Sequence, residues 1–273
     1  MSAMRKYRVV FAVALSDRFV YRGDFFISTL LRFTPIITTI ALWGAIYRGS
    51  NRGGVIGDLT YRQMVGYYLM IMVVRAFGSM PGLASGFAGD IREGNLRKFI
   101  VQPVNYIIYH LHMRMAHKTV YFLMAAVPYA AVFWWCGEYL PGWPPIDRLP
   151  LCMLTLVLSF FLGFLINCTI GLLSFWFLEV TSFMFIFMVS QYFLSGHQFP
   201  LSLLPAPIER VVTWLPFAYE TFYPTMVWLG HYNDDPACIA RIITGQCLWI
   251  SVLSVVVAVG WRRGLRRYSA FGG

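Results

Sequence analysis

One short polar segment stands out among the long apolar runs of this chain. From Gly89 to Asn105 it reads GDIREGNLRKFIVQPVN, and it contains five side chains that are ionised at neutral pH: Asp90, Arg92, Glu93, Arg97 and Lys98. Lipid offers such charges no partners, so the segment must lie in water beside the membrane. A short charged helix there would suit contact with a soluble partner, whereas a solvated loop between two spans is the simpler alternative.

A nucleotide-binding loop of the Walker type is absent from the sequence. Such a loop ends in Gly-Lys-Ser/Thr, because backbone amides and one lysine together hold the phosphates. The lysines of this chain follow Arg or His instead of Gly: Lys6, Lys98 and Lys118. The chain is therefore expected to hydrolyse no ATP of its own by that route.

Metal binding and enzymatic catalysis are also disfavoured. His110 and His117 would share a helix face, but Arg114 lies between them on that face and would repel a cation. We interpret these residues, with His112, as basic residues of the membrane interface. No GxSxG or HExxH motif and no persuasive carboxylate pair occurs. We expect no metal and no cofactor on this chain.

Two ionisable residues, Arg75 and Glu179, remain as candidates for transport chemistry. Arg75 stands near the middle of an apolar run, where a charge is costly unless it faces the bundle interior or water. It is either a pathway residue, one half of an ion pair with Glu179 or another buried acid, or a side chain that snorkels to the surface. Glu179 marks a tight turn, where a surface contact is the simpler role than a proton carrier.

The composition of the chain is that of a polytopic all-α membrane protein, so transmembrane helices must position these residues. Of 273 residues, 58% are hydrophobic and 12% are charged, whereas a soluble domain has about 25% charged residues. The net charge of +10 is spread between apolar runs and forms no single stripe, which argues against nucleic acid as a partner. We expect one transmembrane domain over residues 1–273.

Six apolar runs are predicted to span the membrane: 25–47, 64–87, 106–135, 149–177, 180–194 and 239–261. Residues 1–24 favour an amphipathic helix at the interface, with a cleaved signal peptide as the rival interpretation. Residues 199–224 contain five prolines. This pattern breaks a continuous helix and favours two short helices that enter the outer leaflet and return.

Basic residues concentrate in the N-terminal segment, in residues 90–118 and in the C-terminal tail. The positive-inside rule therefore predicts that both termini and the 89–105 segment are cytoplasmic. Cys136 and Cys238 would then both face the outside, where a disulfide between them is one option and free buried thiols are the other.

This order of parts resembles the membrane subunit of a type-2 ABC exporter. The most specific similarities are DIREGNLRKFIVQPVN (90–105) and a segment, 175–224, that contains a glycine, a proline, LLP and a later LPF. The resemblance is to the bacterial branch in which two related permeases accompany one separate ATPase, which would bind ATP and Mg²⁺. It implies the bacterial inner membrane and an amphipathic, lipid-like or drug-like cargo.

The resemblance also implies roles for individual residues. A coupling helix over 89–105 would contact the ATPase through Asp90, Ile91, Arg92, Glu93, Gly94, Leu96 and Arg97. An outer gate in the re-entrant segment would be shaped by Gly196, Pro200, Leu204, Pro205, Leu215, Pro216 and Phe217. The alternatives are a secondary transporter or channel that uses Arg75 or Glu179 for ion coupling, and a membrane scaffold or enzyme without an ATPase partner.

Overall fold

The computed structural model describes residues 33–49, 55–56, 59–102, 104–140, 142, 144–177, 179–232 and 235–268, with the single positions 11 and 31. The predicted interfacial helix and the start of the first predicted span lie outside these ranges. In chain order the elements are α3 (Thr34–Gly49), β1 (Val55–Ile56), β2 (Leu59–Thr60), α4 (Tyr61–Gly78), α5 (Leu83–Arg92), α6 (Arg97–Val101), α7 (Tyr106–Trp135), η1 (Gly137–Tyr139), α8 (Leu149–Leu172), η2 (Leu173–Phe175), α9 (Thr181–Leu194), η3 (Leu201–Leu203), α10 (Ala206–Trp214), α11 (Pro216–Glu220), α12 (Phe222–Trp228) and α13 (Pro236–Arg267).

Most of the described residues are helical, which confirms the all-α class that the sequence predicts. Three helical stretches are long and apolar enough to cross a membrane: Tyr61–Arg92, Leu149–Phe175 and Pro236–Arg267. The 14-residue α9 is apolar but shorter, and the 30-residue α7 has a polar first half. The count of six spans stays a prediction.

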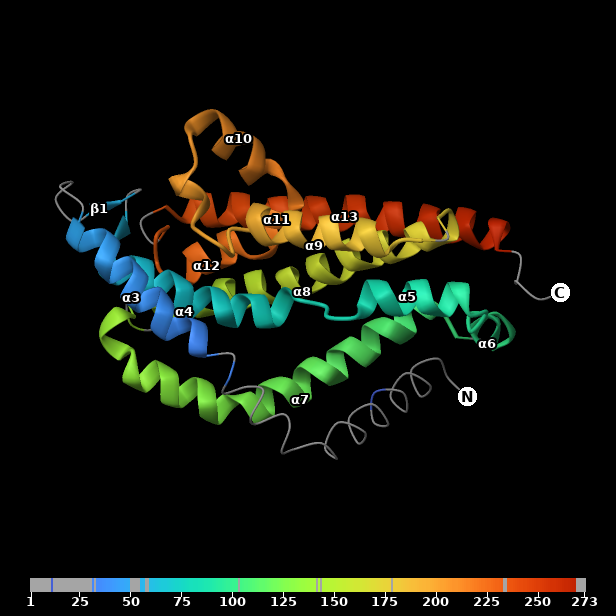
Figure 1. Ribbon diagram of the computed structural model, residues 1–273, viewed down its shortest axis with the longest axis horizontal. Coiled ribbons are helices and arrows are strands. Elements are labelled where there is room, and N and C mark those ends of the chain that lie inside the picture. The colour runs from blue at the N-terminus through green and yellow to red at the C-terminus, as the bar shows by residue number, and fades with distance from the viewer. Residues whose placement is uncertain are drawn as a thin grey trace.

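The bundle is elongated, and α8 lies at its centre. This helix packs against α4, α5 and α13. The segment that contains α6 and the carboxyl end of α13 lie at one end of the molecule, and the short hairpin β1–β2 lies at the other (Figure 1). The hairpin is antiparallel and pairs Val55 with Thr60. Separate apolar clusters therefore form toward the two ends, one around Phe87 and Phe175 and one around Tyr67 and Leu201.

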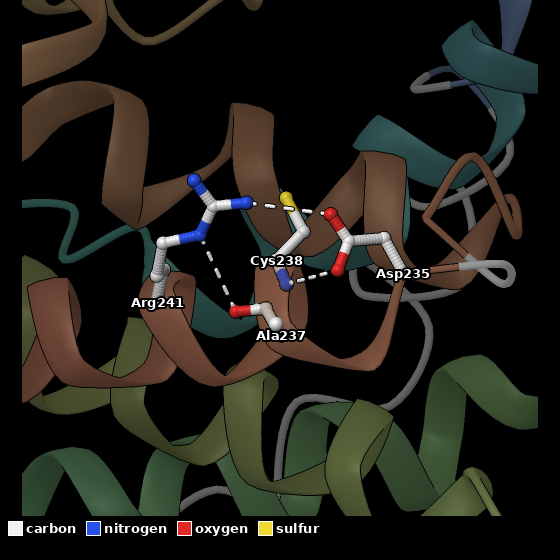
Figure 2. A network of polar contacts seen from close by, with 4 residues as sticks. All are labelled: Asp235, Ala237, Cys238 and Arg241. Carbon is white, nitrogen blue, oxygen red and sulfur yellow. Dashed lines mark hydrogen bonds and ion pairs between the residues drawn. The ribbon is translucent and has the colours of Figure 1, made fainter.

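The start of α13 shows why this helix is longer than the predicted span 239–261. The Asp235 carboxylate caps the helix by accepting a hydrogen bond from the Cys238 backbone N–H at 2.9 Å (Figure 2). Arg241 lies 3.3 Å from the same carboxylate. Cys238 is a free thiol, as is the buried Cys136, so the disulfide option is not realised in the structure.

The second predicted span, 64–87, is not one continuous helix. Helix α4 ends at Gly78 and α5 begins at Leu83, after Gly82 with a backbone φ of 73°. Pro81 lacks a backbone donor and Gly82 takes a left-handed conformation, so the helical hydrogen-bond ladder stops there. Helix α5 then continues to Arg92, beyond the predicted end of the span.

The proline-rich segment 199–224 also differs from the predicted helical pair. It contains η3, α10 and α11, and α12 begins at its end. Pro207 and Pro216 stand in the first turns of α10 and α11, where a missing N–H costs no helical bond. The prolines therefore start short helices and divide the segment more finely than the sequence suggested.

Candidate functional site

The 89–105 segment forms a bend between two helices, not the single short helix that we expected. Its first residues complete α5, and Gly94 turns the chain with a left-handed φ of 77°. The Leu96 N–H then donates to the Asp90 carbonyl at 3.1 Å, and the five-residue α6 follows. Pro103 lies outside the described residues. The resulting bend lies at the end of the bundle where α13 finishes (Figure 1).

Apolar side chains anchor this bend in the core. Ile91 is 7% exposed and Leu96 is fully buried, and both pack in the cluster around Phe87. They were expected to contact an ATPase directly. Their burial instead gives them a structural role, because each removes apolar area from water and fixes the bend against the bundle.

Asp90 also stabilises the bend through contacts inside the chain. Its carboxylate accepts a hydrogen bond from the Tyr106 hydroxyl at 2.7 Å, and His110 Nε2 lies 3.8 Å from the same oxygen. These contacts join the end of α5 to the first turn of α7. Asp90 is thus half-buried and is already engaged inside the chain.

The outward face of the bend carries the remaining charges. Arg92, Glu93 and Arg97 are exposed, as is Lys98. Glu93 accepts a hydrogen bond from the Asn95 side chain at 3.1 Å. This leaves a mainly basic exposed surface, which we call the basic bend: Arg92, Glu93, Arg97 and Lys98.

Glu179 contacts the basic bend. It does not pair with Arg75. Arg92 Nη1 lies 3.8 Å from Glu179 Oε2, and the Thr181 N–H donates to Glu179 Oε1 at 2.8 Å. Hydrogen bonds from Thr181, followed by the charge of Arg92, hold the pKa of Glu179 below its usual value. Both side chains of the ion pair are largely exposed, so it adds little stability. It connects the start of α9 to the basic bend.

Cationic side chains of α7 donate hydrogen bonds to the backbone carbonyls at the break between α4 and α5. Lys118 Nζ donates to the carbonyls of Ala76 and Ser79, the latter at 2.6 Å, and Arg114 Nη1 donates to the Pro81 carbonyl at 2.8 Å. Carbonyls at the end of α4 have lost their helical donors, and a helix carboxyl end attracts cations. The sequence predicts that Arg114 lies at the membrane interface, whereas its guanidinium reaches the break between the two helices. Lys118 is 9% exposed, inside the bundle.

An acidic side chain is buried beside the same break. Glu220 is 3% exposed and its Oε2 accepts a hydrogen bond from Gln191 Nε2 at 2.7 Å. A Cβ atom on Gly163 would overlap the Gly78 carbonyl oxygen and lie 2.9 Å from Glu220 Oε1. The two glycines therefore let α4 and α8 approach closely with the carboxylate of α11 against them.

Arg75 points toward the segment that follows α9. Its Nη1 lies 2.6 Å from His197 Nε2, and its guanidinium lies 5.5 Å from the Tyr192 ring centroid. The structure thus brings Arg75 to His197 and keeps it away from Glu179, which lies at the other end of α9. The two residues are 122 positions apart in the chain, so no local sequence pattern indicates that they pair.

The predicted outer-gate residues fall into two groups. Gly196 has a φ of 76° and accepts a hydrogen bond from the buried Tyr67 hydroxyl at 2.6 Å, and Pro200 is buried nearby in the chain. The second group lies around α11, where the Phe217 ring centroid is 5.8 Å from that of Phe187 on α9. The exposure of the others varies: Leu204, Leu215 and Pro216 are half-buried, and Pro205 is exposed.

Sequence reasoning missed the roles of Lys118, Glu220, Gln191 and Gly163. A signal for two of them was present, because an ionisable residue beside an apolar run has to find a partner. The interrupted stretch GSMPGL at 78–83 also indicated free carbonyls. Gln191 and Gly163 carried no such signal, because only the packing of α8 and α9 gives them their neighbours.

Comparison with known proteins identifies the family of this fold. A family model described as ABC-2 family transporter protein matches residues 33–272, which is most of the chain. No match was found among curated proteins or among solved structures. The matched range includes the basic bend, the break between α4 and α5, and the proline-rich segment. The chain belongs to the ABC-2 transporter family and is a multi-pass membrane subunit of an ABC transporter.

Proposed function

We propose that this chain is the permease subunit of an exporter in the bacterial inner membrane, and that the basic bend docks a separate ATPase. The exposed charges of Arg92, Glu93 and Arg97 on a bend anchored by buried Ile91 and Leu96 are the observation that carries the proposal. A surface that transmits force must offer contacts outward and be held firmly inward. The ATPase binds ATP and Mg²⁺, and this chain binds neither.

Two permeases enclose the pathway. In the proposal they are two different, homologous chains and not two copies of this chain. ATP closes the two ATPases against the basic bends, and differential contact with the two permease states supplies the bias toward outward access. The break between α4 and α5 suits a hinge, because its carbonyls are held by side chains from α7 and not by a helical ladder. Arg75 and Glu220 are the polar residues closest to a pathway role, and the cargo is amphipathic, lipid-like or drug-like.

Orientation enters the proposal through the charge pattern. The basic bend and the four arginines of the last α13 turns lie at one end of the bundle (Figure 1). Both termini and this end are cytoplasmic in the proposal, in line with the positive-inside rule.

The test is co-purification from gently solubilised membranes, with identification of the bound proteins by mass spectrometry. We expect Arg97→Glu to reduce the recovered ATPase by about tenfold, as for a charge reversed at an electrostatic interface. The matched control is Arg210→Glu, a reversal of an exposed arginine on α10, which should retain the ATPase. Full retention in the Arg97→Glu variant together with ATP-independent transport would favour the secondary transporter.

Arg92 needs a second control because it also pairs with Glu179. Arg92→Glu removes both the intrachain pair and the proposed contact, whereas the double change Arg92→Glu, Glu179→Arg restores the pair with exchanged charges. We expect the double variant to stay defective in ATPase recovery. Recovery to the wild-type level would assign Arg92 to the intrachain pair alone.

A further inference from the structure

A hollow of about 390 Å³ opens between the carboxyl end of α8 and the carboxyl half of α13. Its wall is almost wholly apolar. Leu172, Leu173 and Trp176 line one side, and Val256 and Gly260 line the other. Arg263 is the one charged side chain among the described residues that line it.

Two glycines of α13 determine where this hollow begins and ends. A Cβ atom on Gly260 would make an ordinary van der Waals contact with Leu172 Cδ1 at 3.5 Å, and both residues line the hollow. One turn later, the Phe175 ring fills the space in front of Gly264. The hollow is therefore closed toward the end of α13 and open along the valine face that precedes Gly260.

The length of the hollow and its position in the membrane suit a single acyl chain. From Val255 to Arg263 the helix rises by roughly 12 Å. Trp176 lines the hollow together with Arg263, and tryptophan is enriched where the hydrocarbon region meets the headgroups. Arg263 thus lies at headgroup level while the valine face lies at acyl-chain level.

The charge of this region is complementary to an anionic headgroup. The last turns of α13 carry Arg262, Arg263, Arg266 and Arg267. Within the described part of the chain, none of the four forms an ion pair. Clusters of basic residues at the end of a membrane helix attract anionic lipid, and a cationic residue beside an apolar hollow adds a defined position for the phosphate.

We infer that this hollow binds one acyl chain of an anionic phospholipid, with the lipid phosphate paired to Arg263. The inference rests on the membrane placement of α8 and α13 and does not depend on the ATPase contact. A zwitterionic lipid would fill the apolar part equally well but would gain less from the arginines. The lipid would also fill the gap between the two helices that Gly260 leaves.

The test uses the full-length protein reconstituted into bilayers that contain a phospholipid with a diazirine on its acyl chain. Phosphatidylglycerol and phosphatidylcholine versions are compared, and labelled peptides are identified by mass spectrometry. We expect the phosphatidylglycerol probe to label residues 169–176 and 255–263. Arg263→Gln should lower that labelling by about fivefold, because Arg263 lines the hollow and the phosphate of a bound lipid would lose its paired cation. Arg262→Gln is the matched control and should change it far less.

Gly260→Leu fills the hollow and should remove labelling by both probes, with folding checked by gel filtration. Equal labelling by the two probes, unchanged in Arg263→Gln, would overturn the inference and assign the hollow to ordinary annular lipid. Crosslinks from this region to a second copy of the chain in place of lipid would also overturn it. The Arg263→Gln result decides the matter even where Gly260→Leu fails to fold.

Discussion

At the residue scale, the break between α4 and α5 depends on single side chains that satisfy backbone groups within the bundle. Lys118 and Arg114 donate to carbonyls that no helical N–H reaches, and Glu220 lies against two glycines. A buried carbonyl without a donor costs free energy, so the two cationic side chains make an interrupted helix tolerable. Each can be tested by a conservative change.

We expect Lys118→Met to destabilise the protein by about 1–3 kcal/mol, because two carbonyls lose a charged donor inside the bundle. Thermal unfolding in a mild detergent measures the change. Lys98→Met removes the same charge from an exposed position and should stay within about 0.5 kcal/mol of wild type. Equal stability of the two variants would mean that water replaces the Lys118 ammonium without loss.

We expect Gly163→Ala to destabilise by about 1–3 kcal/mol, because the added methyl group overlaps the Gly78 carbonyl oxygen and pushes α4 from α8. The same unfolding assay applies. Gly86→Ala is the control, since nothing lies within 4 Å of a Cβ atom at that position of α5. A Gly163→Ala variant as stable as the control would show that α4 and α8 are free to separate.

At the element scale, α9 is connected to the rest of the bundle more loosely than the basic bend, which Ile91 and Leu96 anchor in the core. Helix α9 has no buried residue along its described length. It is tied at one end by the Arg92–Glu179 pair and farther along by the hydrogen bond from Gln191 to Glu220. Polar ties at separated points let a helix move as a unit, so α9 suits transmission from the bend toward the Arg75–His197 contact.

The turn at Gly94 gives the element-scale prediction. Its φ of 77° is a left-handed conformation, which costs other residues about 1–2 kcal/mol. We expect Gly94→Ala to shift the bend and lower cargo-stimulated ATPase activity in the reconstituted complex, with a smaller loss for Gly94→Asn. Gly89→Ala is the control, because its added Cβ would meet only Glu93 Oε1 at 4.0 Å. Unchanged ATPase activity in the Gly94→Ala variant would mean that the conformation of the bend does not affect coupling to the ATPase.

At the scale of the whole molecule, the two ends of the bundle differ in charge and in backbone regularity. One end has the basic bend and the arginines of α13, and the other has the β1–β2 hairpin (Figure 1). The short helix α10 carries the exposed Arg210. This asymmetry predicts which positions reagents reach from each side of the membrane.

We expect an impermeant thiol reagent to label Arg210→Cys in intact cells and Arg97→Cys only after the membrane is permeabilised. The exposed Cys247 is replaced by serine in both chains to lower the background. The charge of the basic bend opposes its translocation, which is the physical reason for the expected result. The reverse labelling pattern would invert the proposed topology and remove the cytoplasmic ATPase contact.

The sequence by itself determined the all-α membrane class, because apolar runs of this length leave a backbone no other way to satisfy its polar groups in lipid. The apolar runs 106–135 and 180–194 also lie close to the limits of α7 and α9. Local signals such as caps, prolines and charges act within a few residues and can be recognised in one sequence.

Only the tertiary structure decided which polar residues meet. Glu179 contacts Arg92, Arg75 contacts His197, and Lys118 reaches the end of α4, across separations from 39 to 122 positions. The burial of Ile91 and Leu96 likewise came from the packing of α5, because an apolar residue in a polar segment does not reveal which neighbour covers it. Partner choice depends on how helices pack in three dimensions, and one sequence contains no direct record of that.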